Sequence, residues 1–150
     1  MELIIDTREQ NPLKFRLSKN ITEIKSQKLD VGDYSVAGYE TKIAIERKNP
    51  LDLFGTTGKG HERFKREIDR AKEYDYFAII VEAPYSQIKD KTFKQSFRTK
   101  MRGDVVTKII WQWMFKYNIH MHFANDEKEA ARMVRDILLN YVRYKENGNI

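Results

Sequence analysis

The fold of this chain is decided by the stretch of residues 31–52, which reads Val31-Gly32-Asp33-Tyr34-Ser35-Val36-Ala37-Gly38-Tyr39-Glu40-Thr41-Lys42-Ile43-Ala44-Ile45-Glu46-Arg47-Lys48-Asn49-Pro50-Leu51-Asp52. Two apolar segments, residues 31–36 and 41–46, predict β-strands, and the turn residues 37–40 between them predict a hairpin. Proline cannot donate a hydrogen bond to a β-ladder, so Asn49-Pro50 is expected to end the second strand.

The predicted hairpin brings two carboxylates together. If the turn is centred on Tyr39 and Glu40, Asp33 faces Glu46, and directly opposed side chains have Cβ atoms about 5 Å apart. Like charges in that position destabilise a sheet, whereas a bound divalent cation removes the repulsion. Carboxylate oxygens suit Mg²⁺ or Mn²⁺. The hairpin therefore predicts a metal site, unless a bulge shifts the register by one residue.

Three further residues would complete this site. Lys48 lies two positions after Glu46, so a regular strand projects both from the same face. Lys48 would orient a water whose pKa the cation lowers, and would add positive charge where negative charge develops. Arg47 would point to the opposite face of the strand. There it would either bind phosphate, if the strand end is twisted, or form an ion pair with Asp6. Asp52 would bend back after the proline turn to bind the cation or its waters.

A plainer interpretation is that these charges form salt bridges on a hairpin, Asp33 with Lys48 and Glu46 with Arg47. That interpretation suffices for an isolated Glu-x-Lys. The complete set of opposed acids, correctly spaced lysine and nearby acids in a basic chain favours chemistry.

The rest of the chain alternates strands and helices. We expect a strand at residues 3–6, a strand within 21–29, a flexible loop at 55–60, a helix at 61–74, a central strand at 76–82, a basic loop at 87–102, a helix at 104–117, a strand at 119–123 and a helix from Asp126, capped with Glu129. This order favours the α/β class with a mixed sheet. The 150 residues suit a single domain.

Composition limits the functional classes. With 41% hydrophobic and 33% charged residues, the chain has an ordinary globular composition, and the absence of cysteine excludes disulfides and a cysteine nucleophile. No apolar run approaches the roughly 20 residues that span a bilayer, and the N-terminus is too acidic for a signal peptide. We therefore expect a cytoplasmic protein, prokaryotic or acting inside a host cell if viral, with no membrane partner. The net charge of +6 favours nucleic acid as the partner.

At this point the sequence resembles the XPF/Hef-type nuclease domain. That family carries Gly-Asp, a variable gap, Glu-Arg-Lys, three residues and Asp, which stand here as Gly32-Asp33, Glu46-Arg47-Lys48 and Asp52. Upstream, Asp6-Thr7-Arg8-Glu9 resembles the family's opening Asp-x-Arg-Glu. The resemblance extends from residue 1 to about residue 141, and we expect a free-standing version of the domain.

The resemblance implies a restriction-endonuclease-like three-layer α/β/α core and divalent-metal hydrolysis of DNA, typically flaps, forks or junctions in repair or recombination. It also implies a homodimer formed through the C-terminal half. Carried over by position, Asp33, Glu46 and Asp52 would form the acidic cluster, with Lys48 near the attacking water. Asp6, Arg8 and Arg47 would support them.

Two basic regions are candidates for DNA contact. Residues 89–102, the basic segment, hold six basic residues and one acid, with Phe93 and Phe97 placed to stack on unpaired bases; a solvated loop is the alternative. Its proposed contacts are Lys94, Arg98 and Arg102, and those around the helix at 61–74 are Lys59, Arg63, Arg66 and Arg70.

Other residue types carry less information. His120 and His122 are expected to be structural. Of Trp111 and Trp113, which cannot share a helix face, one is expected in the core and the other at a dimer interface.

The sequence is compatible with three functions. The leading hypothesis is an active, structure-selective DNA endonuclease. The second is a non-catalytic DNA-binding partner subunit of the same fold, against which the intact acidic set argues. The third is a sequence-specific restriction-type nuclease, for which the sequence shows no recognition region.

Overall fold

Six strands form one mixed sheet, in the order β2-β1-β3-β4-β5-β6. The computed structural model describes residues 1–148. Its strands are β1 (Glu2–Ile5), β2 (Glu23–Ser26), β3 (Tyr34–Val36), β4 (Ile43–Lys48), β5 (Tyr76–Val81) and β6 (His120–Phe123). Its helices are α1 (Pro50–Thr57), α2 (His61–Arg70), α3 (Tyr85–Lys89), α4 (Gly103–Tyr117) and α5 (Glu127–Asn147), with one 3-10 turn at Ser96–Arg98. Strand β3 runs antiparallel to β1 and β4, and the other neighbouring pairs are parallel.

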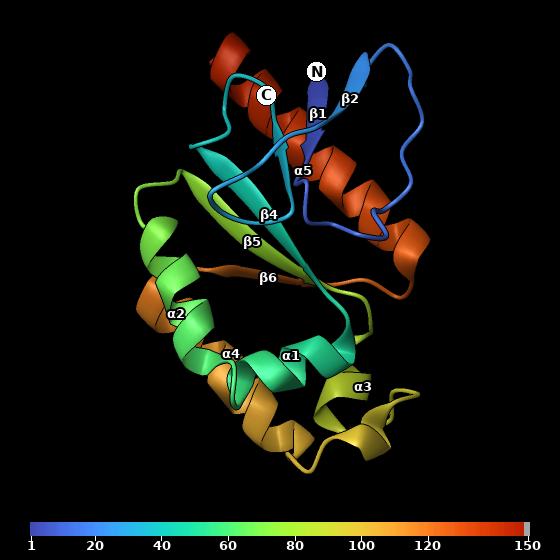
Figure 1. The fold of residues 1–150 in the computed structure, drawn as a ribbon, viewed down its shortest axis with the longest axis vertical. Coiled ribbons are helices and arrows are strands. Elements are labelled where there is room, and N and C mark those ends of the chain that lie inside the picture. The colour runs from blue at the N-terminus through green and yellow to red at the C-terminus, as the bar shows by residue number, and fades with distance from the viewer. Residues whose placement is uncertain (149–150) are drawn as a thin grey trace.

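Helices cover both faces of this sheet (Figure 1). One core joins α5, through Ala130, Val134 and Leu138, to inward side chains of β1, β3 and β4. A second core lies on the opposite face, where α1, α2 and α4 pack on β5. The predicted three-layer α/β/α architecture with a mixed central sheet is thereby confirmed. None of the helices in residues 1–148 combines the length and the apolar character that crossing a bilayer requires.

The hairpin has the predicted register but a shorter first strand. Tyr34 pairs with Ile45, which is the pairing expected for a turn centred on residues 39 and 40. The strand begins at Tyr34 rather than at Val31, because Gly32 adopts a left-handed φ of 74° and bends the chain. Asp33 therefore lies just before the ladder, tied to it by its backbone N–H, which donates to Ile45 O at 2.8 Å.

The predicted flexible loop at residues 55–60 is wrong in its first half, because helix α1 extends to Thr57. Asn49 caps this helix by accepting a hydrogen bond from Asp52 N at 2.8 Å, and Pro50 occupies the first turn, where its missing N–H costs nothing. Asn49-Pro50 thus ends a strand and begins a helix at once. The strand expected within 21–29 covers only β2, and the helix expected at 61–74 ends at Arg70.

The second half of the chain follows the predicted order. Phe77 to Val81 of β5 are buried, as expected of a central strand. Helix α4 stops at Asn118, which takes the left-handed conformation. Asp126 caps α5 by accepting a hydrogen bond from Glu129 N at 2.8 Å. The basic loop contains the end of α3 and the 3-10 turn, so it is less irregular than expected.

Candidate active site

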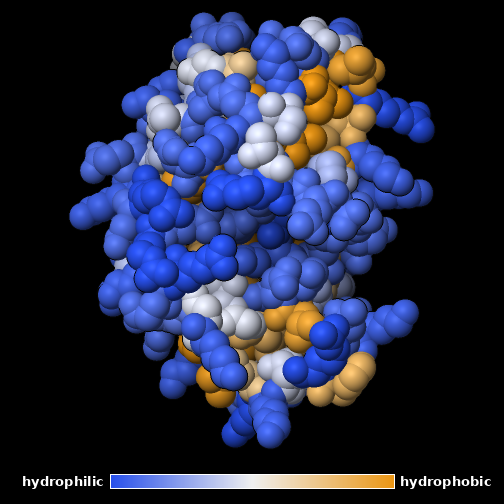
Figure 2. Space-filling model, in the orientation of Figure 1, coloured by the Kyte–Doolittle hydropathy of each residue, from blue (hydrophilic) through white to orange (hydrophobic). Residues whose placement is uncertain are grey.

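A pocket of about 600 Å³ opens between the end of β4, the turn at residues 30–33, and helices α1 and α2. It gathers most of the residues that the sequence singles out: Asp6, Arg8, Asp33, Glu46, Lys48, Asp52, Lys59, Arg63 and Arg70 all line it. Figure 2 shows a hydrophilic surface across the middle of the face drawn in Figure 1, with apolar patches toward its two ends. The chain therefore forms a polar, open site where the hairpin predicted one.

The alternation of side chains along β4 determines which residues face the pocket. Glu46 and Lys48 point toward α1 and α2, as their spacing predicts, and both line the pocket. The Lys48 Nζ lies 5.9 Å from the centre of the Phe64 ring, so a ring of α2 supports the ammonium group from one side. Arg47 lies on the other face of the strand and does not line this pocket.

Glu46 is a buried carboxyl group among other carboxyl groups. Only 8% of the residue is exposed. Burial raises the pKa of Glu46 well above its ordinary value, and the neighbouring carboxylates of Asp33 and Glu67 raise it further. A cation between these groups would reverse this effect, because it favours the charged form.

The backbone of β4 orients Asp33. Its Oδ2 accepts a hydrogen bond from Arg47 N at 2.7 Å, and its own N–H donates to Ile45 O. The half-buried Asp33 carboxylate therefore has one oxygen held by the strand while the residue faces the pocket. Asp52 lies in the first turn of α1 and is exposed at the rim.

The donor set fits a hydrated hard cation rather than a fully enclosed one. Among residues 1–148, no three histidine, cysteine, aspartate or glutamate side chains form a compact ligand cluster. Mg²⁺ usually keeps several waters and binds through one or two carboxylates. Asp33 and Glu46 could provide that pair, and Asp52, which lines the same pocket, could accept hydrogen bonds from waters of the ion.

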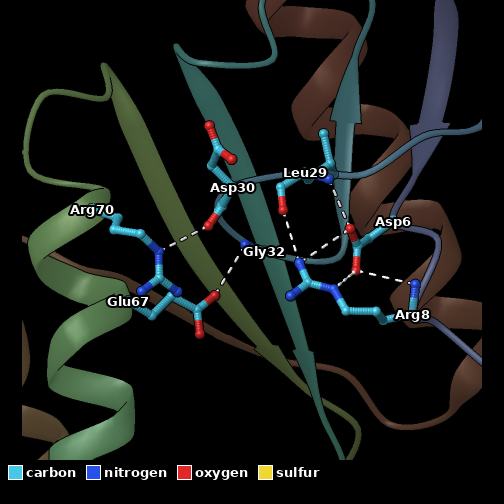
Figure 3. Close-up of polar contacts among 7 residues, drawn as sticks. All are labelled: Asp6, Arg8, Leu29, Asp30, Gly32, Glu67 and Arg70. Atoms are coloured by element: carbon cyan, nitrogen blue, oxygen red, sulfur yellow. Dashed lines mark hydrogen bonds and ion pairs between the residues drawn. The ribbon is translucent and has the colours of Figure 1, made fainter.

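Asp6 and Arg8 form a clamp in the wall of the pocket, in which Asp6 is buried and Arg8 is exposed (Figure 3). Arg8 Nε donates to Asp6 Oδ2 at 2.8 Å, and Leu29 N donates to Asp6 Oδ1 at 2.8 Å. Burial alone would raise the pKa of Asp6, but the hydrogen bonds from Arg8 and Leu29 outweigh it and lower the pKa. The arginine also donates to Leu29 O at 2.8 Å, so the pair fixes the segment that leads to Asp33.

Arg47 lines a second polar depression, which shares Arg8 and Asp52 with the first pocket. It contacts Glu82 and the Asn11 carbonyl directly, and its Nη1 lies 3.7 Å from Glu9 Oε2. Its Nη2 lies 3.6 Å from Glu127 Oε1 at the start of α5. The alternative of an ion pair with Asp6 is wrong, since Asp6 pairs with Arg8.

Glu67 is the pocket residue that sequence reasoning missed. It projects from α2, and its Oε1 accepts a hydrogen bond from Gly32 N at 3.0 Å. The available signal was its position three residues after Phe64 and one before Ile68, at the edge of the buried stripe of the helix. A carboxylate in that position points along the core boundary rather than fully into solvent.

The candidate DNA contacts divide into two groups. Lys59, Arg63 and Arg70 line the pocket, and the exposed Arg66 lies outside it. Lys94, Arg98 and Arg102 are exposed on the basic segment, where Arg102 pairs with Asp104 at 2.6 Å.

The two phenylalanines of the basic segment differ. Phe97 is 83% exposed. The prediction that Phe93 stacks on bases is wrong: this ring is buried against Phe54, with centroids 5.1 Å apart.

The two histidines of β6 and one of the two tryptophans of α4 have the packing expected of them. The centroids of the His120 and Tyr76 rings lie 4.2 Å apart, and His122 Nε2 lies 2.8 Å from Tyr76 Oη. Both histidines therefore pack against β5 at the edge of the sheet. Trp113 is the core tryptophan, with its ring 4.8 Å from that of Phe64. Trp111 is 48% exposed.

The chain is similar to known proteins in sequence and in fold. The sequence matches the family described as ERCC4 domain over residues 5–137. Its structure is similar to that of XPF from Aeropyrum pernix, at 22% identity and a TM-score of 0.74, covering 100% of this chain and 64% of that one. XPF from Aeropyrum pernix in complex with DNA matches at 20% identity and a TM-score of 0.67, covering 95% of this chain and 65% of that one. No curated protein sequence matches this chain.

The matched region contains the whole pocket. It begins just before Asp6 and ends within α5, so the acidic pair, Lys48 and the clamp all lie inside it. The two solved structures share its fold. The chain therefore belongs to the ERCC4 domain family, the XPF-type nuclease domains.

Proposed function

We propose that this protein is a divalent-metal-dependent endonuclease that hydrolyses phosphodiester bonds in DNA. The observation that carries the proposal is the buried Glu46 carboxyl beside Asp33, with Lys48 on the same face of β4. Neighbouring carboxylates with no positive charge between them destabilise a fold. A bound ligand of opposite charge therefore best explains why Asp33 and Glu46 lie together. Family membership supports the same reaction.

Each residue has a distinct task in the proposed reaction. Asp33 and Glu46 would hold Mg²⁺ or Mn²⁺, with Asp52 contacting its waters. When bound, such an ion supplies Lewis-acid assistance to water and phosphate. Lys48 donates a hydrogen bond that orients the attacking water and places positive charge near the phosphoryl oxygens as their negative charge grows. Arg8 adds a further positive charge at the pocket wall.

We further propose that the DNA is branched, as a flap, fork or junction, and that the enzyme acts in repair or recombination. Lys59, Arg63 and Arg70 give the pocket rim the charge needed to hold a phosphate backbone. The exposed ring of Phe97 beside the basic residues of the basic segment suits an unpaired base. Branch points supply both a duplex and unpaired nucleotides.

A homodimer is the proposed assembly. Helix α4 exposes Trp111 and Phe115, at 48% and 82%, four positions apart on one face of the helix. Aromatic residues are enriched in protein interfaces, and exposed neighbouring rings on one helix face are uncommon on monomers. A second copy is the occupant that a family with dimeric nuclease domains favours.

The decisive experiment is cleavage of labelled flap, fork, four-way junction and linear duplex DNA with Mg²⁺ or Mn²⁺. Glu46→Gln and Lys48→Ala should each lower the rate by about 100-fold or more, the usual effect of removing one group that stabilises transition-state charge. Glu62→Gln is the matched control, since Glu62 is 80% exposed on α2 outside the pocket. Tight DNA binding without cleavage under any metal would instead favour the non-catalytic partner subunit.

A second measurement tests the basic segment. The variant neutralises three of its charges together, those of Lys94, Arg98 and Arg102. The slope of the logarithm of the DNA-binding constant against the logarithm of the salt concentration should then flatten by about two to three units, at about 0.7–0.9 per phosphate contact. An unchanged slope would mean that the segment is a solvated loop. The grip on DNA would then come from the rim of the pocket.

A further inference from the structure

We propose that Glu67 is a positioning residue, which anchors the turn at residues 30–33 to helix α2 and thereby holds Asp33 in place for the reaction. This inference rests on the proposed function. The hairpin pattern does not predict this anchor, because the anchor comes from a separate element 35 positions away along the chain.

Two side chains of α2 reach the turn (Figure 3). Glu67 Oε1 accepts a hydrogen bond from Gly32 N at 3.0 Å. One helical turn further on, Arg70 Nε donates to Asp30 O at 3.0 Å. The Glu67 carboxylate therefore binds a backbone N–H of the turn, and the Arg70 guanidinium binds a backbone carbonyl of the same turn.

The turn needs such an anchor because it lies outside the β-ladder. Gly32 is buried and has a φ of 74°, and a Cβ atom there would lie 3.0 Å from Ile45 O. The backbone is thus pressed against β4 in a conformation that leaves the Gly32 N–H directed away from the strand. A buried N–H without an acceptor is costly, and Glu67 supplies that acceptor.

The other contacts of the turn explain why this one matters for Asp33. Asp6 and Arg8 fix the chain at Leu29, and β4 fixes Asp33 itself. Between these two attachments, the turn is held by α2. Freeing Gly32 would let the Asp33 carboxylate drift relative to Glu46, and small displacements of reacting groups are expensive for catalysis.

A matched pair of substitutions tests the anchor. Glu67→Gln and Glu67→Met both remove the negative charge and keep a side chain of similar length, but only glutamine retains an oxygen acceptor. Glu67→Met should lower kcat by about 10–100-fold with KM for DNA changed less than about threefold. Glu67→Gln should retain kcat within about threefold. Glu62→Met, on the exposed side of the same helix, is the control for the substitution itself.

A second readout does not depend on activity. Amide hydrogen exchange of Gly32 should accelerate by about fivefold or more in Glu67→Met, and stay near the wild-type rate in Glu67→Gln. If Glu67→Gln loses as much activity as Glu67→Met, Glu67 acts through its charge and the positioning role is overturned. Wild-type activity and exchange in Glu67→Met would overturn it as well. If the wild-type protein cuts no DNA, the proposed function fails, while the exchange rates still decide whether the anchor exists.

Discussion

Replacing Glu46 with glutamine should stabilise the metal-free protein, and the gain should grow as the pH rises. Burial, then the carboxylates of Asp33 and Glu67, raise the pKa of Glu46 above the ordinary 4.5 in the folded state. The folded state therefore holds this proton more tightly than the unfolded chain does. The stabilisation that protonated Glu46 gives the folded state is complete below about pH 4.5. It is lost as the pH rises through the raised pKa of the folded state. Glutamine has no proton to lose.

The size of the gain follows from the separation of the charges. Two unit charges about 5 Å apart repel by about 3 kcal/mol at an effective dielectric constant of about 20. Protonation of Glu46 limits the repulsion at lower pH, so the gain should be near zero at about pH 5 and about 1–3 kcal/mol at about pH 9. For a domain of 150 residues, 1 kcal/mol corresponds to about 2–4 °C, which gives a rise in Tm of about 2–12 °C.

Thermal unfolding in a chelating buffer between about pH 5 and pH 9 measures this effect. Glu62→Gln again serves as the exposed control. Added Mg²⁺ should raise the Tm of the wild-type protein by mass action, and should raise that of Glu46→Gln less. A metal-free Glu46→Gln that melts below the wild type at high pH, or a difference that does not change with pH, would refute the argument.

Four other substitutions probe the clamp, the basic segment and the proposed interface. Asp6→Ala leaves the buried Leu29 N–H without its acceptor and should cost about 2–4 kcal/mol in urea unfolding; a wild-type midpoint would show that the clamp is not structural. Phe97→Ala should weaken binding to branched or single-stranded DNA by about 1–3 kcal/mol and spare plain duplex. Phe93→Ala should instead destabilise the fold by about 3–5 kcal/mol, since its ring is buried; equal effects on binding from the two variants would contradict this division. Phe115→Lys should convert a dimer to a monomer in sedimentation experiments and make the Tm independent of protein concentration, and an unchanged mass would exclude this face as the interface.

Much of the site was readable from the amino-acid sequence because neighbours along the chain govern it. The side-chain period of a strand places Glu46 and Lys48 together on one face, whatever the rest of the fold does. The turn between the two strands sets the pairing of Tyr34 with Ile45, and so brings Asp33 to Glu46. Asp126 caps its helix through a residue three positions away. Each of these features depends on backbone geometry over only a few residues.

Other features required the tertiary structure, because residues far apart in sequence create them. Glu67 meets Gly32, and Arg47 meets Glu82, only after α2 and β5 have packed against β4. Phe93 and Phe97 have the same basic surroundings in the sequence, yet only Phe93 packs against Phe54 in the core. Local patterns thus specified the acids and the lysine, whereas long-range packing decided which side chains hold them in place, because burial is a property of the assembled layers and not of any segment alone.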